Sequence, residues 1–141
     1  LYFRGMEERN HHSLVLKQGA EPAAQRLGFK MGSEEDLDRA AAFFKERQLP
    51  AKFVEVPFQG RTLHAADAQG NPLELYFKMD QGERILQQYG HYAGCHPQRF
   101  DHFNVFTPDP QASIEFYAAL GFRLTEYAES DDAVPRIAAA W

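Results

Sequence analysis

One histidine stands inside a short apolar alternation in the stretch RFDHFNVFTPD, which runs from Arg99 to Asp109. In a strand, alternate residues share a face, so His102 and Asn104 would point to one side and Phe103 to the other. An imidazole beside a carboxylate such as Asp101 can bind a metal through one nitrogen while an acceptor orients the other. Taken alone, the pattern leaves two interpretations open: a metal ligand, or a packed strand histidine without chemistry.

The other potential ligands do not form a recognisable metal-binding pattern. His11 and His12 are adjacent and would face opposite ways in a strand, and His64 stands apart from them. The single cysteine, Cys95, lacks the second Cys or His pair that a zinc motif requires. Glu74 lies where the last strand of a first repeat is expected, and there a solvated or hydrogen-bonded carboxylate is the favoured interpretation.

The composition indicates one ordinary globular domain with a real core. The chain has 141 residues, 44% of them hydrophobic, and a formal net charge of -5. Because Lys and Arg are scattered, no basic stripe is available for a phosphate backbone, and a nucleic-acid partner is not expected. The apolar runs are too short to span a bilayer, so we expect no membrane association and a cytoplasmic location.

The elements that would position His102 repeat along the chain. A strand over 11–17 is expected first, then a β-α-β-β-β unit with strands over 26–31, 51–58, 61–67 and 73–79. Its helix, over 33–48, has Ser33 as N-cap and acidic residues in its first turn. The helix face expected to pack on the sheet comprises Leu37, Ala40, Ala41, Phe44 and Gln48.

The same order of elements starts again after a polar connector over 81–94, which is expected to be helical. A strand over 100–106, a helix over 109–121 that ends at Gly121, and a strand over 122–129 are predicted. Ser33 and Thr107 precede the two helices at an offset of 107 − 33 = 74. At this offset the first repeat has Gly28 where the second has His102, which hints at a function in the second repeat.

These residues resemble the extradiol catechol dioxygenases of the vicinal oxygen chelate superfamily, which also contains glyoxalase I and bleomycin-resistance proteins. The segments that carry the resemblance are EERNHHSLVL, RFDHFNVFTPD, LGFRLTEY and the terminal AAW. It is strongest to the members that act on homoprotocatechuate (3,4-dihydroxyphenylacetate), with metapyrocatechases as relatives. The implied fold class is α+β, built of βαβββ modules, with one whole module and one incomplete module in this chain.

The resemblance also implies how the chain is divided. Residues 1–23 would be the end of a preceding module, with 1–5 a possible tag remnant, and 24–80 a non-catalytic module. Residues 81–99 would be a connector and 100–141 the start of the catalytic module, which the sequence ends before completing. By resemblance, His102 is the first metal ligand, while Asn104 and Trp141 contact the substrate.

The resemblance implies a reaction for the intact protein: ring opening of a catechol next to its hydroxyls, with O2 and Fe(II) or Mn(II), in aromatic catabolism. The second histidine and the glutamate ligand would lie beyond Trp141, so we expect this fragment to bind no metal and to be inactive alone. Two alternatives remain open, a small-molecule-binding module and a glyoxalase-type lyase or isomerase. Apolar faces bearing Phe103, Val105 and Phe116 lead us to expect a homo-oligomer, as a dimer or a swapped assembly.

Overall fold

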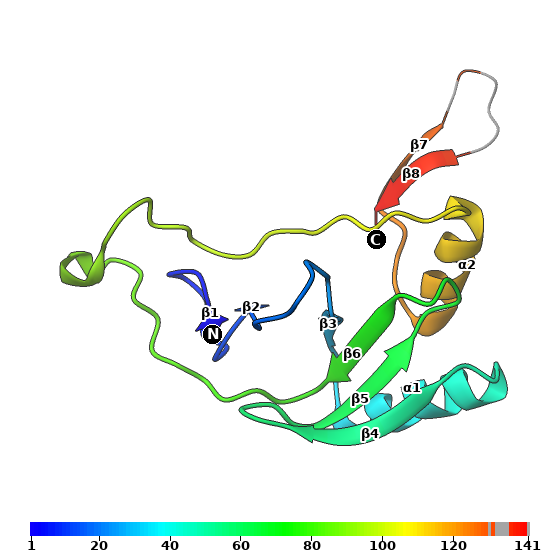
Figure 1. Ribbon diagram of the computed structural model, residues 1–141, viewed down its shortest axis with the longest axis horizontal. Helices are drawn as coiled ribbons and strands as arrows, with labels where there is room; N and C mark the ends of the chain where they lie inside the picture. Colours follow the sequence, from blue (N-terminus) through cyan, green and yellow to red (C-terminus); the bar gives the residue numbers. More distant parts are fainter. Residues whose placement is uncertain (130, 132–135, 141) are drawn as a thin grey trace.

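A four-stranded sheet, covered on one face by two helices, forms the centre of the molecule (Figure 1). The computed structural model describes residues 1–129, 131 and 136–140, with only the backbone described for 136–140. In chain order the elements are β1 (Tyr2–Phe3), β2 (Leu14–Val15), β3 (Leu27–Lys30), α1 (Glu34–Glu46), β4 (Ala51–Val56), β5 (Gly60–Ala66), β6 (Pro72–Tyr76), η1 (Tyr89–His91), α2 (Pro110–Leu120), β7 (Glu126–Glu129) and β8 (Arg136–Ala140). The expected α+β class is confirmed.

The first repeat folds as the predicted β-α-β-β-β unit. Its strands lie in the order β3-β6-β5-β4, with β3 parallel to β6 and the two other pairs antiparallel. Because side chains alternate across a sheet, one face is apolar and the other polar. The apolar face includes the cross-strand row Phe29, Leu75, Leu63 and Phe53, and the polar face includes the row Gly28, Glu74, His64 and Lys52.

Local capping sets the start of α1. The Ser33 side chain accepts a hydrogen bond from the backbone N–H of Asp36, as the sequence predicts, and the acidic first turn complements the helix dipole. Leu37, Ala40 and Phe44 are buried against the sheet. Gln48, predicted on this buried face, is instead exposed, because the helix ends at Glu46 and Gln48 adopts a positive φ of 55°.

The second helix packs on the same face of the sheet as the first. Phe116 and Tyr117 of α2 join Leu37, Phe44 and the leucines of β5 and β6 in one buried cluster. Asp109 caps the helix, Pro110 occupies its first turn, and Gly121 ends it with a φ of 112°. The two repeats therefore share one core. The expectation that Phe116 lies on an exposed apolar face is wrong, since only 7% of it is accessible.

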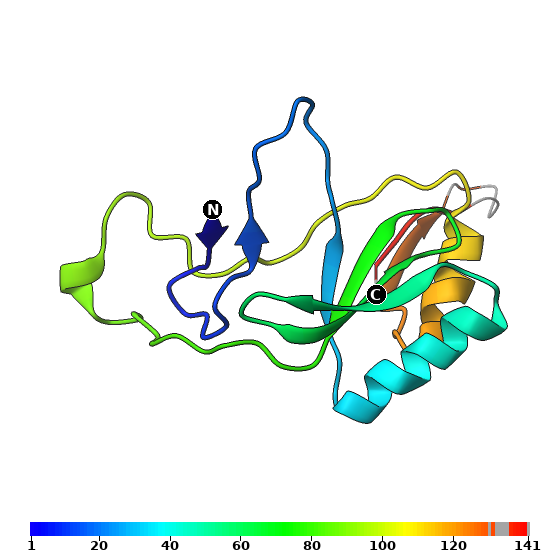
Figure 2. The same ribbon diagram turned by 60° about the horizontal axis from the view of Figure 1, so that its bottom comes forward.

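The connector between the repeats is extended rather than helical. It runs away from β6, passes through the single 3-10 turn η1 and returns to α2 (Figures 1 and 2). Gly82, Gly90 and Gly94 weaken a helix here, and no residue of η1 is buried to stabilise one. Its backbone instead forms hydrogen bonds with the N-terminal segment. One of them runs from the N–H of Ile85 to the carbonyl of Met6.

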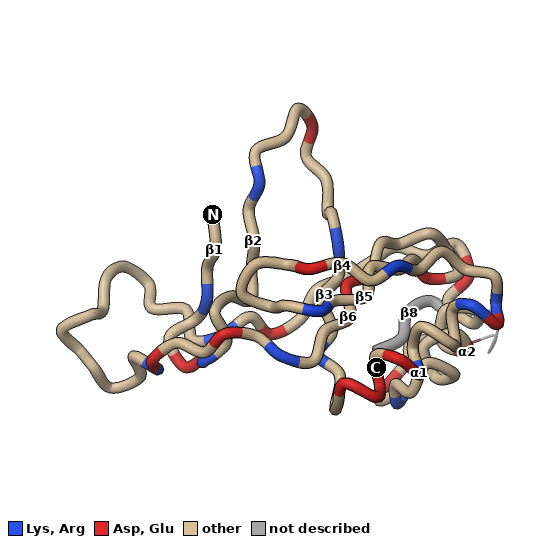
Figure 3. The backbone as a smooth tube through the Cα atoms, turned by 90° about the horizontal axis from the view of Figure 1, so that it is seen from below, with Lys and Arg blue, Asp and Glu red and all other residues tan. Residues whose placement is uncertain are grey.

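Charged residues of both signs are interspersed along the chain. Figure 3 shows Lys and Arg separated by Asp and Glu, without a basic stripe, as the sequence predicts. Neither helix in the described part of the chain is long and apolar enough to cross a membrane.

Candidate functional site

His102 lies in an extended segment that is not part of a sheet. The predicted strand over 100–106 is not formed, because residues 101–106 make no backbone hydrogen bond to another described residue. In the first repeat the equivalent strand, β3, is held by its parallel partner β6. A strand needs such a partner, and none pairs with 101–106 within the described ranges. The alternation of the sequence therefore predicted a strand for which the described structure supplies no partner.

The His102 ring is exposed and oriented by the preceding carboxylate. Its Nδ1–H donates to Oδ2 of Asp101 at 2.9 Å, and 74% of the side chain is accessible. This hydrogen bond, with the charge of Arg99 next in importance, lowers the pKa of Asp101. Because Nδ1 is engaged, Nε2 is the nitrogen left to bind a metal, which is the usual arrangement of a histidine ligand.

Among the described residues, the structure shows no second proposed site residue in contact with the His102 side chain. Asn104 is exposed two residues further along the same extended segment, and Trp141 lies outside the described residues. Phe103, between His102 and Asn104, is 39% accessible, and its ring centroid lies 5.9 Å from that of Phe29. The roles of Asn104 and Trp141 in substrate binding stay predictions.

The described residues do not complete a metal site. Among them, no group of three or more His, Cys, Asp and Glu side chains is arranged to hold an ion. His102 could occupy one position of a coordination sphere, because the Asp101 carboxylate holds its ring. A mononuclear site of the two-histidine, one-carboxylate kind needs two donors more.

The polar face of the sheet carries a hydrogen-bonded network centred on Glu74. Glu74 Oε2 accepts from Nε2–H of His64 at 2.9 Å, and Oε1 accepts from the amide of Gln59 at 2.9 Å. The Gln59 amide also donates to the hydroxyl of Thr62 at 3.1 Å. Both Glu74 oxygens thus accept a hydrogen bond, which confirms the expectation of a hydrogen-bonded carboxylate.

Sequence reasoning missed the partnership between His64 and Glu74. The two residues are directly opposite in the antiparallel pair of β5 and β6, and Gly28 of β3 follows Glu74 in the same row. The available signal was the turn AQGNP, because His64 and Glu74 are equally distant from its residue Gln69. Two strands joined by a symmetric turn place such residues side by side.

The two adjacent histidines near the N-terminus also interact, contrary to the prediction that they face opposite ways. Nδ1 of His11 lies 3.1 Å from Nδ1 of His12, since β2 begins only at Leu14 and alternation does not apply before it. The His11 ring stacks on Phe58 with centroids 3.7 Å apart. Burial, followed by the charge of His11, lowers the pKa of His12, while the charge of Glu74 raises it.

Comparison with known proteins links this arrangement to a family. A sequence profile of the Glyoxalase/Bleomycin resistance protein/Dioxygenase superfamily matches residues 99–140, the part that contains His102. A manganese-dependent 2,3-dihydroxybiphenyl 1,2-dioxygenase of Geobacillus genomosp. 3 is 26% identical over 90% of this chain and 44% of its own length. A metapyrocatechase of Geobacillus stearothermophilus is 23% identical over 89% of this chain and 42% of its own length.

Solved structures agree over nearly the whole chain. Homoprotocatechuate 2,3-dioxygenase from Brevibacterium fuscum superposes with a TM-score of 0.90 and 33% identity, covering 98% of this chain and 39% of the other. The enzyme of the same name from Arthrobacter globiformis gives 0.90 and 32%, covering 98% and 44%. The resemblance to extradiol dioxygenases of the vicinal oxygen chelate fold is therefore confirmed, and the chain spans about two fifths of the length of these relatives.

Proposed function

We propose that these 141 residues are part of a metal-dependent extradiol ring-cleaving dioxygenase that opens a catechol with O2. The observation that carries the proposal is the likeness over 98% of the chain, at 33% identity, to an enzyme named for this activity. The substrate class, a catechol such as 3,4-dihydroxyphenylacetate, comes from the names of the similar enzymes. A cytoplasmic location and a homo-oligomeric state belong to the same proposal.

The proposed division of the chain follows its elements. Residues 24–80 correspond to a non-catalytic module, since β3, α1, β4, β5 and β6 form a whole βαβββ unit. Residues 100–141 correspond to the start of a catalytic module, because α2 and the pair of β7 and β8 follow the His102 segment. Residues 1–23 would be the end of a preceding module and 81–99 a connector.

Within this division His102 is the proposed metal ligand of the chain. The first module has Gly28 at the equivalent position, and Asp101 already holds the His102 ring by its second nitrogen. Asn104 and Trp141 are proposed to contact the substrate. Fe(II) or Mn(II) is the proposed metal, one similar enzyme being named as manganese-dependent. Such an ion supplies Lewis-acid and template chemistry when bound, and its other donors would come from beyond the described residues.

The test uses the full-length protein, expressed from its complete gene with Fe2+ or Mn2+ supplied. We expect about one metal ion per subunit and a yellow ring-opened product from 3,4-dihydroxyphenylacetate, both lost in His102→Ala. The matched control is His91→Ala, which removes another exposed imidazole, from η1 in the connector. A His102→Ala protein that keeps its metal and turns over the catechol would contradict the proposal.

A further inference from the structure

The helix that follows the His102 segment is anchored in the first module. Tyr117 of α2 is 2% accessible, and its hydroxyl donates to Oδ2 of Asp67 at 2.9 Å. Asp67 follows β5 directly, in the turn that leads to β6. Burial, followed by this hydrogen bond, raises the pKa of Tyr117, so the phenol remains a donor at neutral pH.

Asp67 is itself fixed by several donors. Its Oδ1 accepts from the backbone N–H groups of Gln69 and Asn71, and its Oδ2 accepts from the Asn71 side-chain amide, all between 2.8 and 2.9 Å. Only 4% of Asp67 is accessible to solvent. A buried carboxylate with this set of partners is a rigid acceptor, so the Tyr117 hydroxyl has a defined position.

An aromatic contact fixes the His102 segment from the same module. The ring of Phe29, on β3, lies 5.9 Å from that of Phe103, 6.4 Å from Tyr117 and 4.9 Å from Phe122. Phe103 is the residue next to His102, and its ring lies beside that of Phe29 while 39% of the residue stays accessible. This contact ties the residue next to His102 to β3, while the His102 side chain itself stays 74% accessible.

The start of α2 is joined to the His102 segment by local hydrogen bonds. The Thr107 hydroxyl lies 3.0 Å from that of Ser113, and Asp109 Oδ1 accepts from the N–H of Ala112. A shift of α2 would therefore carry Thr107, and the chain before it, along. The first module thus controls this segment at two points, the Phe29–Phe103 contact and the Asp67–Tyr117 hydrogen bond.

We propose that Asp67, Tyr117 and Phe29 are positioning residues that hold the His102 imidazole at the metal site. The proposal rests on the proposed function, because it assigns His102 the role of ligand. In this proposal the module without a metal holds the ligand histidine of the next module in place.

The test measures metal release from the full-length holoprotein to a chelator, together with KM and kcat for the catechol. Tyr117→Phe removes one hydroxyl and keeps the ring, and we expect release about fivefold faster, the effect of one hydrogen bond. Asp67→Asn should act similarly, and the double variant should add little to either single change. Phe29→Leu should accelerate release and raise KM more than it lowers kcat.

Ser33→Ala is the matched control. It removes the two hydrogen bonds between the Ser33 hydroxyl and Asp36 at the N-terminus of α1 and does not touch α2 or Asp67. Release at the wild-type rate in Tyr117→Phe, or equal acceleration in Ser33→Ala, would overturn the positioning role while His102→Ala still loses the metal. If His102→Ala retains the metal, the proposed function fails, and the positioning role fails with it.

Discussion

The carboxylate of Glu74 is the centre of the polar network in the first module. We expect Glu74→Ala to lower the free energy of unfolding by about 2 kcal/mol, because the buried Gln59 amide and His64 both lose a charged acceptor. Oε1 of Gln59 already has no partner among the described residues, so this side chain would become still less satisfied. Urea unfolding of the 141-residue chain measures the change.

The control for this change is Glu55→Ala on β4, which removes an exposed carboxylate from the same sheet. Equal stability losses in the Glu74 and Glu55 variants would show that the network contributes nothing beyond general charge effects.

His12 gives stability a pH dependence of defined sign. Burial lowers its pKa in the folded chain from the ordinary value of 6.5, so the fold favours the neutral imidazole. Its contribution is fully present above pH 6.5 and is lost as the pH falls below this value. We expect His12→Gln to flatten the stability profile in this window, measured by urea unfolding at a series of pH values. An unchanged slope below pH 6.5 would contradict this assignment.

Among single residues, the sequence indicated which side chains carry reactive groups but not which side chains they bond to. His102 and Glu74 stood out by type and position, whereas the bonds of Glu74 to His64 and Gln59 depend on the register of β5, β6 and the turn before them. Register is a property of the paired strands, so no local pattern states it directly.

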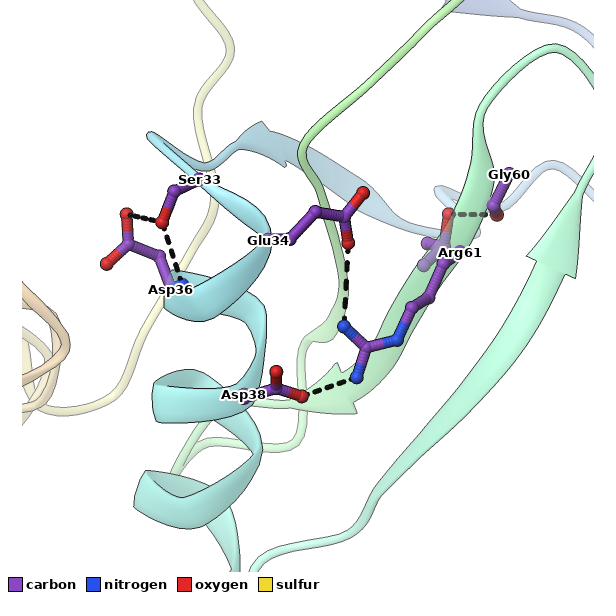
Figure 4. A network of polar contacts seen from close by, with 7 residues as sticks. Ser33, Glu34, Asp36, Asp38, Gly60 and Arg61 are labelled. Carbon is purple, nitrogen blue, oxygen red and sulfur yellow. Dashed lines mark hydrogen bonds and ion pairs between the residues drawn. The ribbon is translucent and has the colours of Figure 1, made fainter.

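Among the elements, α1 shows which interaction dominates its attachment to the sheet. Arg61 of β5 reaches Glu34 and Asp38 on the helix (Figure 4), and its guanidinium lies 3.9 Å from the centroid of the Phe53 ring. These charges are exposed and screened by water, whereas Phe44 is fully buried. We expect Phe44→Ala to cost about 3 to 5 kcal/mol of unfolding free energy and Arg61→Met far less.

Thermal and urea unfolding of both variants, with Ser33→Ala as a third, would rank the contributions. An Arg61→Met loss as large as that of Phe44→Ala would mean that the ion pairs, not the core, hold the helix.

The elements that the sequence predicted well are those with local signals. Ser33 and Gly121 mark the ends of α1 and α2 by capping, which needs no distant partner. The strand over 100–106 and the helix over 81–94 were predicted wrongly, because each requires a surface to pack on or a strand to pair with. Neither requirement can be read from the segment itself.

At the scale of the whole molecule, the repeat predicted two related units but not their shared core. Phe43 and Phe116, matched by the repeat at an offset of 73, lie with ring centroids 5.5 Å apart. The sequence predicted packing on the sheet only for the first helix, whereas α2 packs on the same sheet as well. Periodicity shows which face is buried and leaves open which neighbour buries it.

The extended segment around His102 governs self-association of the isolated chain. Phe100, Phe103, Val105 and Phe106 are between 36% and 100% accessible, and the backbone beside them has no sheet partner in the described structure. Apolar side chains along an unpaired stretch of backbone favour pairing with another chain. We therefore expect a dimer or larger assembly of the 141-residue chain in size-exclusion chromatography with light scattering.

Phe106→Ser should weaken this self-association at least about tenfold, because one buried phenylalanine contributes about 2 kcal/mol. Tyr89→Ser, which changes an exposed ring on η1, should leave it unaltered, and a monomer at all concentrations would contradict the expectation.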